Sequence, residues 1–267
     1  MPATLPDMRA DGRRNDQLRE ITITRNFTST PAGSVLWKQG NTIVLATASI
    51  TPDVPPWFGD NRAGGWVTAD YVMLPGSTPR RKDWPKIGHT DSRGTEIQRI
   101  VGRSLRAVVD LSKIGPHTIA IDCQVLQADG GTRTASICAG FLALRDAVSK
   151  LPTDFPVAKG PVLPRADGTL PPRYDPALYD PQRALVDDLA AVSVGIVDGD
   201  VRLDLDYADD SRASVDLNVA YTGGGKFVEV QGSAENGEGF EPAKLLEMTE
   251  LAVKGCVALL RRMRDGT

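Results

Sequence analysis

Hydrophobic positions alternate with a period of two along the first part of the chain, which predicts β-strands. The predicted strands are residues 20–27, 34–38, 42–49 and 65–74. Gln39-Gly40-Asn41 separates the second strand from the third, so these two form a hairpin. From Thr95 the hydrophobic spacing becomes that of an amphipathic helix, whose opposite face is strongly basic and carries Glu96, Arg99, Arg103, Arg106 and Asp110.

A further strand and a second helix follow, joined by a glycine-rich turn. Residues 118–126 alternate as a strand, and the helix after them has a predicted buried stripe of Ile137, Phe141, Leu144 and Val148. Residues 152–186 then contain eight of the chain's 19 prolines, which forbid regular structure over most of that span. We expect a long surface loop there.

The remaining part repeats the strand pattern and ends in a long helix. Strands are predicted for residues 191–197, 201–207, 214–221 and 226–231. A helix from about Pro242 to Arg264 follows, and its predicted inner face consists of Leu245, Leu246, Ala252, Cys256, Leu259, Leu260 and Met263. Hairpins followed by helices in both halves indicate an α+β fold, and no shift in composition divides residues 1–267 into separate domains.

Composition excludes fibrous, disordered and disulfide-scaffold proteins. The chain has 267 residues, of which 41% are hydrophobic and 24% are charged, as in ordinary globular proteins with a sizeable core. Its three cysteines lie far apart and form no CxxC pair, which fits a reducing compartment. The N-terminus is polar, as a signal peptide is not, and no run of residues is apolar enough for a membrane span. We therefore expect a cytoplasmic protein.

Charge is segregated along the chain, although the formal net charge is only −3. Residues 80–106 hold eight basic and three acidic side chains, a local charge of +5, which leaves −8 for the rest. The eight are Arg80, Arg81, Lys82, Lys86, Arg93, Arg99, Arg103 and Arg106. A basic patch on an acidic protein suits a polyphosphate backbone, but arginines of the helix could instead pair with carboxylates across a subunit interface.

The glycine-rich turn in LQADGGTRT, residues 126–134, is a candidate phosphate site. Gly130 and Gly131 let the backbone approach a ligand closely, the first N–H groups of the following helix lack intrahelical acceptors, and Arg133 adds a bidentate fork. Arg93, just before the predicted helix at Thr95, repeats this arrangement. Alternatively, the glycine-rich turn is only a tight connection between strand and helix, and its arginine faces solvent.

Carboxylates cluster in residues 204–216. Asp210 lies at the turn before the strand 214–221, and Asp216 shares one face of that strand with Asn218. Two neighbouring carboxylates can bind Mg²⁺ together with a substrate phosphate, or retain one proton for general acid catalysis. Alternatively, these carboxylates are simply exposed to solvent and have no catalytic role.

Long blocks in the right order make this chain resemble the ribonuclease PH family, phosphorolytic 3′-to-5′ exoribonucleases. The blocks include RADGRRNDQLREITITRNFT, PAGSVLWKQGNTIVLATASI, GTEIQRIVGRSLRAVVDL, TIAIDCQVLQADGGTRTASI and FVEVQGSAE. Several such blocks are far more specific than any single short motif.

The resemblance implies an RNase PH fold of the ribosomal protein S5 domain 2 type, in a single domain with a proline-rich insertion at about 155–186. It implies a ring-shaped homohexamer, a trimer of dimers, that trims the 3′ ends of tRNA precursors. By position, Arg93, Gly131, Thr132 and Arg133 would bind inorganic phosphate, the co-substrate. Asp210 and Asp216 would be the catalytic carboxylates and hold Mg²⁺, and Arg80, Arg81 and Lys82 would bind RNA.

The basic loop departs from the family pattern, because Gly76 stands where the family usually has an arginine. Three other functions stay open. The first is a catalytically silent ring subunit that binds RNA, and the second is a phosphorylase that degrades RNA more broadly. The third is a phosphate-independent hydrolase, which would release nucleoside monophosphates.

Overall fold

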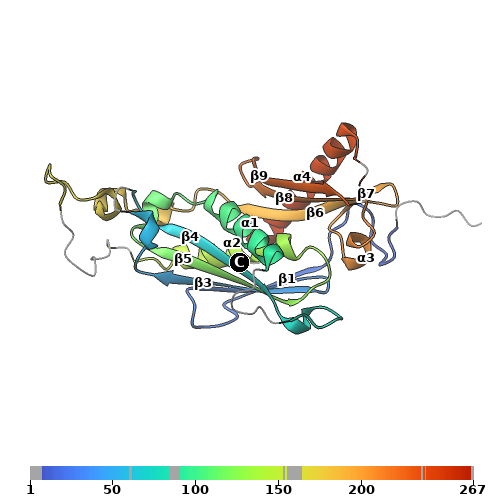
Figure 1. Cartoon of the computed structure of the whole chain (residues 1–267), viewed down its shortest axis with the longest axis horizontal. Coiled ribbons are helices and arrows are strands. Elements are labelled where there is room, and N and C mark those ends of the chain that lie inside the picture. Colours follow the sequence, from blue (N-terminus) through green and yellow to red (C-terminus); the bar gives the residue numbers. More distant parts are fainter. Residues whose placement is uncertain are drawn as a thin grey trace, which may run out of the picture.

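The structure is a computed structural model that describes residues 8–59, 62–83, 91–152, 154, 164–235, 237 and 239–265. It contains two β-sheets with helices between and outside them, as Figure 1 shows. One hydrophobic cluster includes buried residues from both sheets and from α1, α2 and α4. The predicted α+β class and the RNase PH fold are confirmed.

The first sheet has five strands in the order β1-β2-β3-β5-β4. They are β1 (Ile21–Arg25), β2 (Gly33–Gln39), β3 (Thr42–Thr51), β4 (Trp66–Met73) and β5 (Thr118–Gln127). All neighbours are antiparallel except β4 and β5, which are parallel. The predicted hairpin is β2–β3, in which Gln39 pairs with Thr42 across a turn that Gly40 makes with a φ of 56°.

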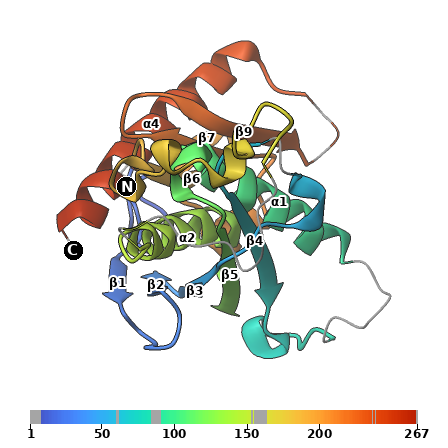
Figure 2. The same cartoon turned by 90° about the vertical axis from the view of Figure 1, so that its left-hand side faces the viewer.

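The second sheet has four antiparallel strands in the order β7-β6-β8-β9. They are β6 (Leu189–Val197), β7 (Asp200–Leu203), β8 (Val215–Thr222) and β9 (Phe227–Ala234). A four-residue helix, α3 (Tyr207–Asp210), lies between β7 and β8, and α4 (Pro242–Asp265) packs on the outer face of this sheet. Figures 1 and 2 show α4 on the side of the second sheet that faces away from α2.

Two helices lie between the sheets. α1 (Ser92–Arg106) packs on β4, and α2 (Thr132–Val148) packs on β2, β3 and β5 from one side and on β6 from the other. Of the described helices, none is long and apolar enough to cross a membrane.

Four local predictions are wrong. α1 begins at Ser92, before Thr95, because the Asp91 carboxylate accepts a hydrogen bond from the Gly94 N–H (3.0 Å) and caps the helix. β7 ends at Leu203, because the chain turns at Asp204, whose φ is +56°.

The other two errors concern burial. α2 is buried on nearly every side and not along one stripe, because sheets cover both of its faces. Leu245 and Leu246 of α4 are exposed and not part of its inner face, because the helix contacts the sheet only further along, from Met248 onward.

The described part of the proline-rich segment has no long helix or strand. It contains three short 3₁₀ turns at residues 172–174, 176–178 and 181–183. The segment is attached to the core where the Asp110 N–H donates to the Ala184 carbonyl oxygen (2.7 Å) and the Val186 N–H to that of Val108 (2.9 Å). Residues 155–163 of the predicted insertion, and Lys86 of the basic stretch, lie outside the described residues.

Candidate active site

All nine residues that the resemblance assigns to the site line one cavity of about 630 Å³. The cavity lies between the end of β4, the start of α2 and the inner strands β6 and β8 of the second sheet. Residues from three separate stretches of the sequence, 80–93, 131–133 and 210–216, thus meet at one place. The nine residues are Arg80, Arg81, Lys82, Arg93, Gly131, Thr132, Arg133, Asp210 and Asp216.

The glycine-rich turn is shaped by its backbone. Gly130 and Gly131 have φ values of 72° and 66°, the left-handed region that favours glycine. Gly131 is the N-cap of α2, and no side chain caps that helix, so its first turn offers N–H donors at the cavity wall. The turn is held in place because the Thr42 hydroxyl donates to the Gly130 carbonyl oxygen (2.7 Å).

Two arginines from different helices border the cavity. Arg133 is in the first turn of α2, and Arg93 is in the first turn of α1. The Tyr71 hydroxyl donates to Thr132 Oγ1 (2.9 Å), which fixes the α2 turn to β4. The arrangement places positive charge and uncapped helix N–H groups around one space, which is suited to binding a phosphate.

Asp216 on β8 and Asp210 at the end of α3 form the acidic side of the cavity. Burial, together with the charge of Asp210, raises the pKa of Asp216 to about 6. Burial also raises the pKa of Asp210, and the nearby Arg93 and Arg133 partly oppose this. Asp216 Oδ2 lies 3.9 Å from Arg133 Nη1 and accepts a hydrogen bond from Asn218 Nδ2 (2.9 Å).

The two carboxylates could hold a divalent cation. Asp216 Oδ1 is buried and has no hydrogen-bond partner among the described residues. A buried carboxylate oxygen without a donor is costly unless it binds a cation. The described residues contain no group of three or more His, Cys, Asp or Glu side chains that could bind a metal. A pair of carboxylates fits Mg²⁺, which keeps several waters and takes further oxygens from a substrate phosphate.

A second cavity of about 660 Å³ adjoins the first. The two share Arg93, Arg133, Asp210, Asp216 and Asn218, so these residues stand between them. The second cavity extends toward β9, where Gln231 Nε2 donates to the Glu96 carboxylate of α1 (2.5 Å). The candidate catalytic groups are therefore reachable from two sides.

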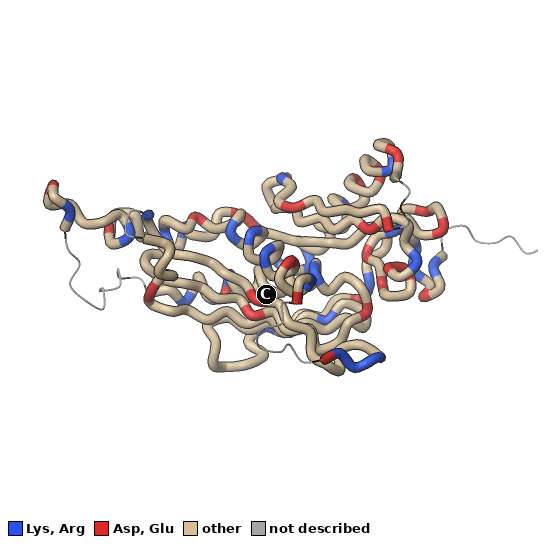
Figure 3. Tube along the Cα trace, viewed as in Figure 1, with Lys and Arg blue, Asp and Glu red and all other residues tan. Residues whose placement is uncertain are grey.

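The predicted RNA-binding segment forms an exposed basic loop at the mouth of the first cavity. Arg80, Arg81 and Lys82 are all exposed, and Figure 3 shows this loop as a continuous stretch of blue at the lower right. The loop is attached to the end of β4 because the Lys82 N–H donates to the Pro75 carbonyl oxygen (2.9 Å). The loop thus projects positive charge beside the carboxylates.

The arginines of α1 do not form one basic face with this loop. Arg103 makes two hydrogen bonds of 2.6 Å with Glu229 of β9, within the same chain. Arg106 lies over the Trp66 ring, 4.5 Å from its centroid, and donates to the Val67 carbonyl oxygen (2.9 Å). The other two arginines of α1 are both exposed: Arg93 lines the cavity, and Arg99 makes no such contact with the described residues.

Sequence reasoning missed several residues of the site. Tyr207 lines the cavity and is 62% exposed, and its N–H donates to Asp129 Oδ1 (3.2 Å). Asp129 stands beside the two glycines, so its position was a signal that could have been used. Ser193 and Met73 also line the cavity, and nothing in their local patterns marks them.

The comparisons with known proteins agree with this geometry. The 3′ exoribonuclease family matches in both of its parts, domain 1 over residues 17–150 and domain 2 over residues 189–255. The chain belongs to this family. The predicted membership is confirmed, and the unmatched interval 151–188 contains the whole proline-rich segment.

Relatives with known names cover almost the whole chain. The chain is 50% identical to the ribonuclease PH of Nocardia farcinica over 258 residues, which are 96% of this chain and 91% of that protein. It is 47% identical to the ribonuclease PH of Rhodopirellula baltica over 249 residues, 93% of each chain. The predicted enzyme class, a phosphorolytic 3′-to-5′ exoribonuclease, is confirmed by these relatives.

Solved structures share the fold at low sequence identity. A chain of the Archaeoglobus fulgidus exosome, solved with RNA bound to the active site, has a TM-score of 0.71 and 22% identity, covering 96% of this chain and 91% of that one. Rice (Oryza sativa) Rrp46 has a TM-score of 0.68 and 20% identity, covering 96% and 97%. At these identities the likeness concerns the fold alone.

Proposed function

We propose that this chain trims the 3′ ends of RNA, tRNA precursors in particular, by phosphorolysis in the cavity described above. The single observation that supports the proposal best is the placement of Arg93, the Gly131–Arg133 turn, Asp210 and Asp216 around one space. A phosphate nucleophile and a phosphodiester repel each other, so the site must supply positive charge to both.

Phosphate is bound by Arg93, the N-terminal turn of α2 and Arg133. An oxygen of this phosphate attacks the terminal phosphodiester phosphorus, the bond to the 3′ oxygen breaks, and a nucleoside 5′-diphosphate is released. The shortened RNA keeps a 3′ hydroxyl, whose oxygen takes up a proton. Fixed guanidinium groups position the phosphate and stabilise the charge that develops in the transition state.

Asp210 and Asp216 have two tasks in this scheme. They would hold Mg²⁺, which would stabilise negative charge on the reacting phosphoryl oxygens. Without the metal, burial and the charge of Asp210 raise the pKa of Asp216 to about 6, so the metal-free pair retains a proton more readily than exposed aspartates do. The protonated carboxyl group donates this proton to the departing 3′ oxygen.

The RNA strand lies along the exposed loop of Arg80, Arg81 and Lys82. Their charges contact backbone phosphates, which would make binding depend on salt but not on sequence. Tyr207, which also lines the cavity, offers an exposed ring on which a base can stack. Gly76 leaves space where an arginine of the family would stand, and we expect weaker contacts to tRNA there.

A product assay tests the function. A tRNA precursor with a 3′ extension is incubated with Mg²⁺, with and without inorganic phosphate, and the products are separated by thin-layer chromatography. Nucleoside diphosphates that require phosphate support the proposal. Monophosphates indicate hydrolysis, no product indicates a silent RNA-binding subunit, and digestion that continues into the mature tRNA indicates broader degradation.

Two variants and a matched control test the phosphate site. Arg93→Ala and Arg133→Ala should each reduce kcat/KM for phosphate about 100-fold or more, because each removes one charged donor to the phosphate. Arg183→Ala, at a side chain that is 80% exposed and outside the cavity, should leave it unchanged. A phosphate dependence equal in all three variants would refute the assignment.

We further propose a homohexamer working in the cytoplasm, built from single-domain subunits with the insertion at about 155–186. Phe227, Val230, Leu245 and Leu246 are exposed apolar side chains on β9 and α4, which supports a subunit contact there. The free thiols of the three buried cysteines fit a reducing compartment. Light scattering should give a mass about six times 28.7 kDa.

A further inference from the structure

The N-terminal strap, residues 8–19, contains three buried arginines that no step of the proposed reaction uses. Arg9, Arg13 and Arg19 are only 6%, 8% and 7% exposed. The strap is joined to the second sheet where the Leu203 N–H donates to the Asn15 carbonyl oxygen (2.8 Å).

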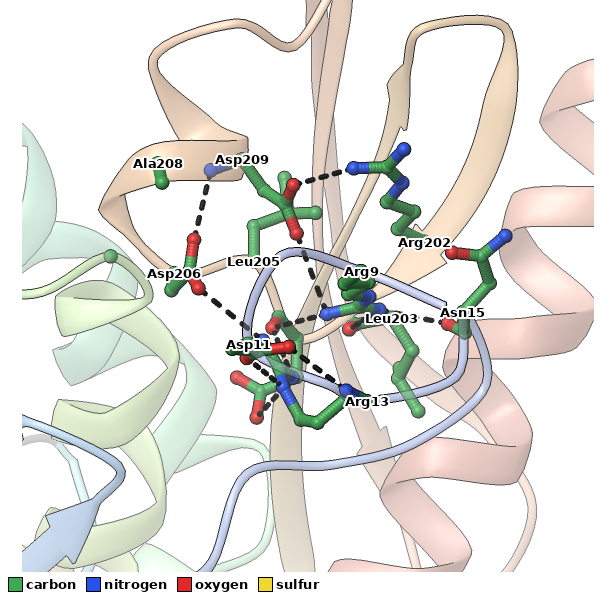
Figure 4. A network of polar contacts seen from close by, with 12 residues as sticks. Arg9, Asp11, Arg13, Asn15, Arg202, Leu203, Leu205, Asp206, Ala208 and Asp209 are labelled. Carbon is green, nitrogen blue, oxygen red and sulfur yellow. Dashed lines mark hydrogen bonds and ion pairs between the residues drawn. The ribbon is translucent and has the colours of Figure 1, made fainter. Parts of the chain in front are cut away.

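Arg9 lies between the end of β7 and α3, as Figure 4 shows. Its guanidinium donates to the carbonyl oxygens of Leu203, Asn15 (2.8 Å) and Asp204 (3.2 Å). It also lies 3.6 Å from the Asp209 carboxylate. Burial, with the charge of Arg13, lowers the pKa of Arg9 to about 10, so the group is still charged at neutral pH.

Three arginines hold Asp209, and one of them is Arg212, whose Nη2 lies 3.5 Å from Asp209 Oδ1. Arg202 Nη1 donates to Asp209 Oδ1 (2.6 Å), and Arg9 lies near Oδ2 of the same carboxylate. Asp209 is only 4% exposed and directly precedes Asp210 in α3. A four-residue helix has almost no stability of its own, so these contacts set where Asp210 lies.

Arg19 joins this turn to the phosphate loop. Its backbone N–H (2.7 Å) and its Nη2 (2.6 Å) both donate to the Asp204 carboxylate. Its Nη1 donates to the carbonyl oxygen of Asp129 (2.5 Å), beside Gly130. One guanidinium thus connects the turn that leads into α3 with the loop that leads into α2.

Stability alone does not account for these arginines. Buried ion pairs are often no more stabilising than apolar side chains of the same volume, because desolvation offsets the attraction. What a guanidinium adds is direction, since its planar fork fixes several acceptors at once. The cavity walls are formed by other residues, so Arg9 and Arg19 do not contact the substrate there.

We propose that the strap is a positioning element, in which Arg9 and Arg19 set the distance between Asp210 and the phosphate-binding turn Gly131–Arg133. They are positioning residues and not catalytic residues. This inference rests on the proposed function, because it assigns Asp210 and the turn to one reaction. Displacing a reacting group by about 1 Å can cost 100-fold in rate, so such an element has a large effect.

The test compares Arg9→Met and Arg9→Lys with Arg14→Met. Arg14 is in the same strap, but its side chain is 66% exposed. Four quantities are measured on the full-length protein: Tm, kcat per folded molecule, KM for inorganic phosphate, and the rise in Tm on adding Mg²⁺ alone. Arg9→Lys keeps the charge but loses the fork, so it decides the matter if Arg9→Met does not fold.

We expect both Arg9 variants to lower kcat about 10- to 100-fold and to reduce the Mg²⁺-dependent rise in Tm. KM for phosphate should change less than about twofold, because the phosphate ligands are not displaced. Arg14→Met should match the unchanged protein. Loss of kcat with a proportional rise in KM, or a kcat per folded molecule that is unchanged, would overturn the proposal.

The outcome also separates this proposal from the function. If the unchanged protein releases no nucleoside diphosphates from RNA and phosphate, the proposed function fails. The Mg²⁺-dependent rise in Tm then still tests the strap, since an Arg9→Lys variant with an undiminished rise contradicts it. If the unchanged protein is active and the Arg9 variants are equally active, only the strap proposal fails.

Discussion

The phosphate loop, residues 129–131, and the carboxylate turn, residues 204–210, lie against each other but are held by different kinds of contact. The loop follows from local sequence, with two glycines at positive φ between a strand and a helix. The turn depends on distant residues, because Asp204 pairs with Arg19 and Asp209 lies near Arg9. The loop is therefore built by backbone geometry and the turn by buried charge.

This difference has energetic consequences. A backbone turn with glycine at the required φ contains little that a side-chain substitution elsewhere can disturb. A turn held by buried ions is sensitive to any change that leaves one of them unpaired, at a cost of several kcal/mol. Four substitutions compare the two designs, from the largest expected effect to the smallest.

Arg19→Met should reduce the free energy of unfolding by about 3–5 kcal/mol, because it leaves the buried Asp204 carboxylate with only the more distant Arg13, at 3.8 Å. Asp204 is only 2% exposed, and although burial would raise its pKa, the Arg19 guanidinium holds the pKa below its usual value. Urea denaturation measures the loss. Arg14→Met, at an exposed arginine, should change stability by less than about 1 kcal/mol.

The Arg19→Met, Asp204→Asn double variant provides a second check. It removes both charges, so it should be more stable than Arg19→Met alone if the unpaired carboxylate is the cause. A double variant that loses the sum of the two single losses would show that the pair acts only through packing.

Gly130→Ala should lower the free energy of unfolding by about 2–4 kcal/mol. Alanine is strained in the left-handed backbone conformation, and its methyl group overpacks the contact with the carboxylate turn. A Cβ at Gly130 would lie 2.5 Å from the Leu205 carbonyl oxygen and 2.6 Å from the Asp206 carbonyl carbon. The methyl group would push the carboxylate turn away from the phosphate loop. Activity should therefore fall along with stability, which the product assay and urea denaturation measure together.

Gly199→Ala is the matched control for this change. Its φ of 89° is equally unfavourable for alanine, but a Cβ there would have nothing within 4 Å. Gly199→Ala should lower the free energy of unfolding by about 1–2 kcal/mol, from the strained backbone alone, and leave kcat unchanged. Equal losses of stability and activity in both variants would mean that the close approach of loop and turn does not matter.

The same contrast explains how much the sequence could predict. Alternation and turn residues predicted, approximately, all nine strands and the three long helices of the described residues, because each depends on neighbours in sequence. The phosphate turn was found for the same reason. The strap was missed because RADGRR has the composition of an exposed segment, and only the fold shows that Arg9 and Arg13 are buried.

Long-range packing also accounts for the errors in the elements. The strand predicted to reach Tyr207 ends at Leu203, because Asp204 turns to meet Arg19, which is 185 residues away. α2 was predicted to be buried on one face, and no local pattern could show that a second sheet covers the other. The roles of Asp210 and Asp216 came from the resemblance, since acidic turns are common.

Asp216→Asn should increase the free energy of unfolding by about 1–2 kcal/mol at pH 7.5 without Mg²⁺, while abolishing activity. Burial and Asp210 raise the pKa of Asp216 to about 6. A raised pKa means that the folded state favours the protonated carboxyl, so stability is lost as pH rises from about 4 to 6. The variant's advantage should therefore vanish near pH 4, which thermal melts across this range measure.

Mg²⁺ sharpens this measurement. It should raise the Tm of the unchanged protein at pH 7.5, because it offsets the repulsion within the carboxylate pair, and should raise that of Asp216→Asn much less. Asn218→Ala serves as a control that keeps both carboxylates. If the Tm of Asp216→Asn is lower than that of the unchanged protein at pH 7.5, the ionised Asp216 does not destabilise the folded state as predicted.

Arg103→Gln should have the smallest effect and lower the free energy of unfolding by less than about 1 kcal/mol, although Arg103 also joins the two halves of the molecule. It connects α1 to Glu229 of β9 by two hydrogen bonds, but its side chain is 50% exposed. Solvent and salt screen such a pair, so raising the ionic strength should abolish the loss. The loss in Arg19→Met should persist at high salt, because that pair is buried. Arg99→Gln, on the same helix, controls for the change of charge, and a salt-independent loss in Arg103→Gln would mean that exposure does not distinguish the two connections.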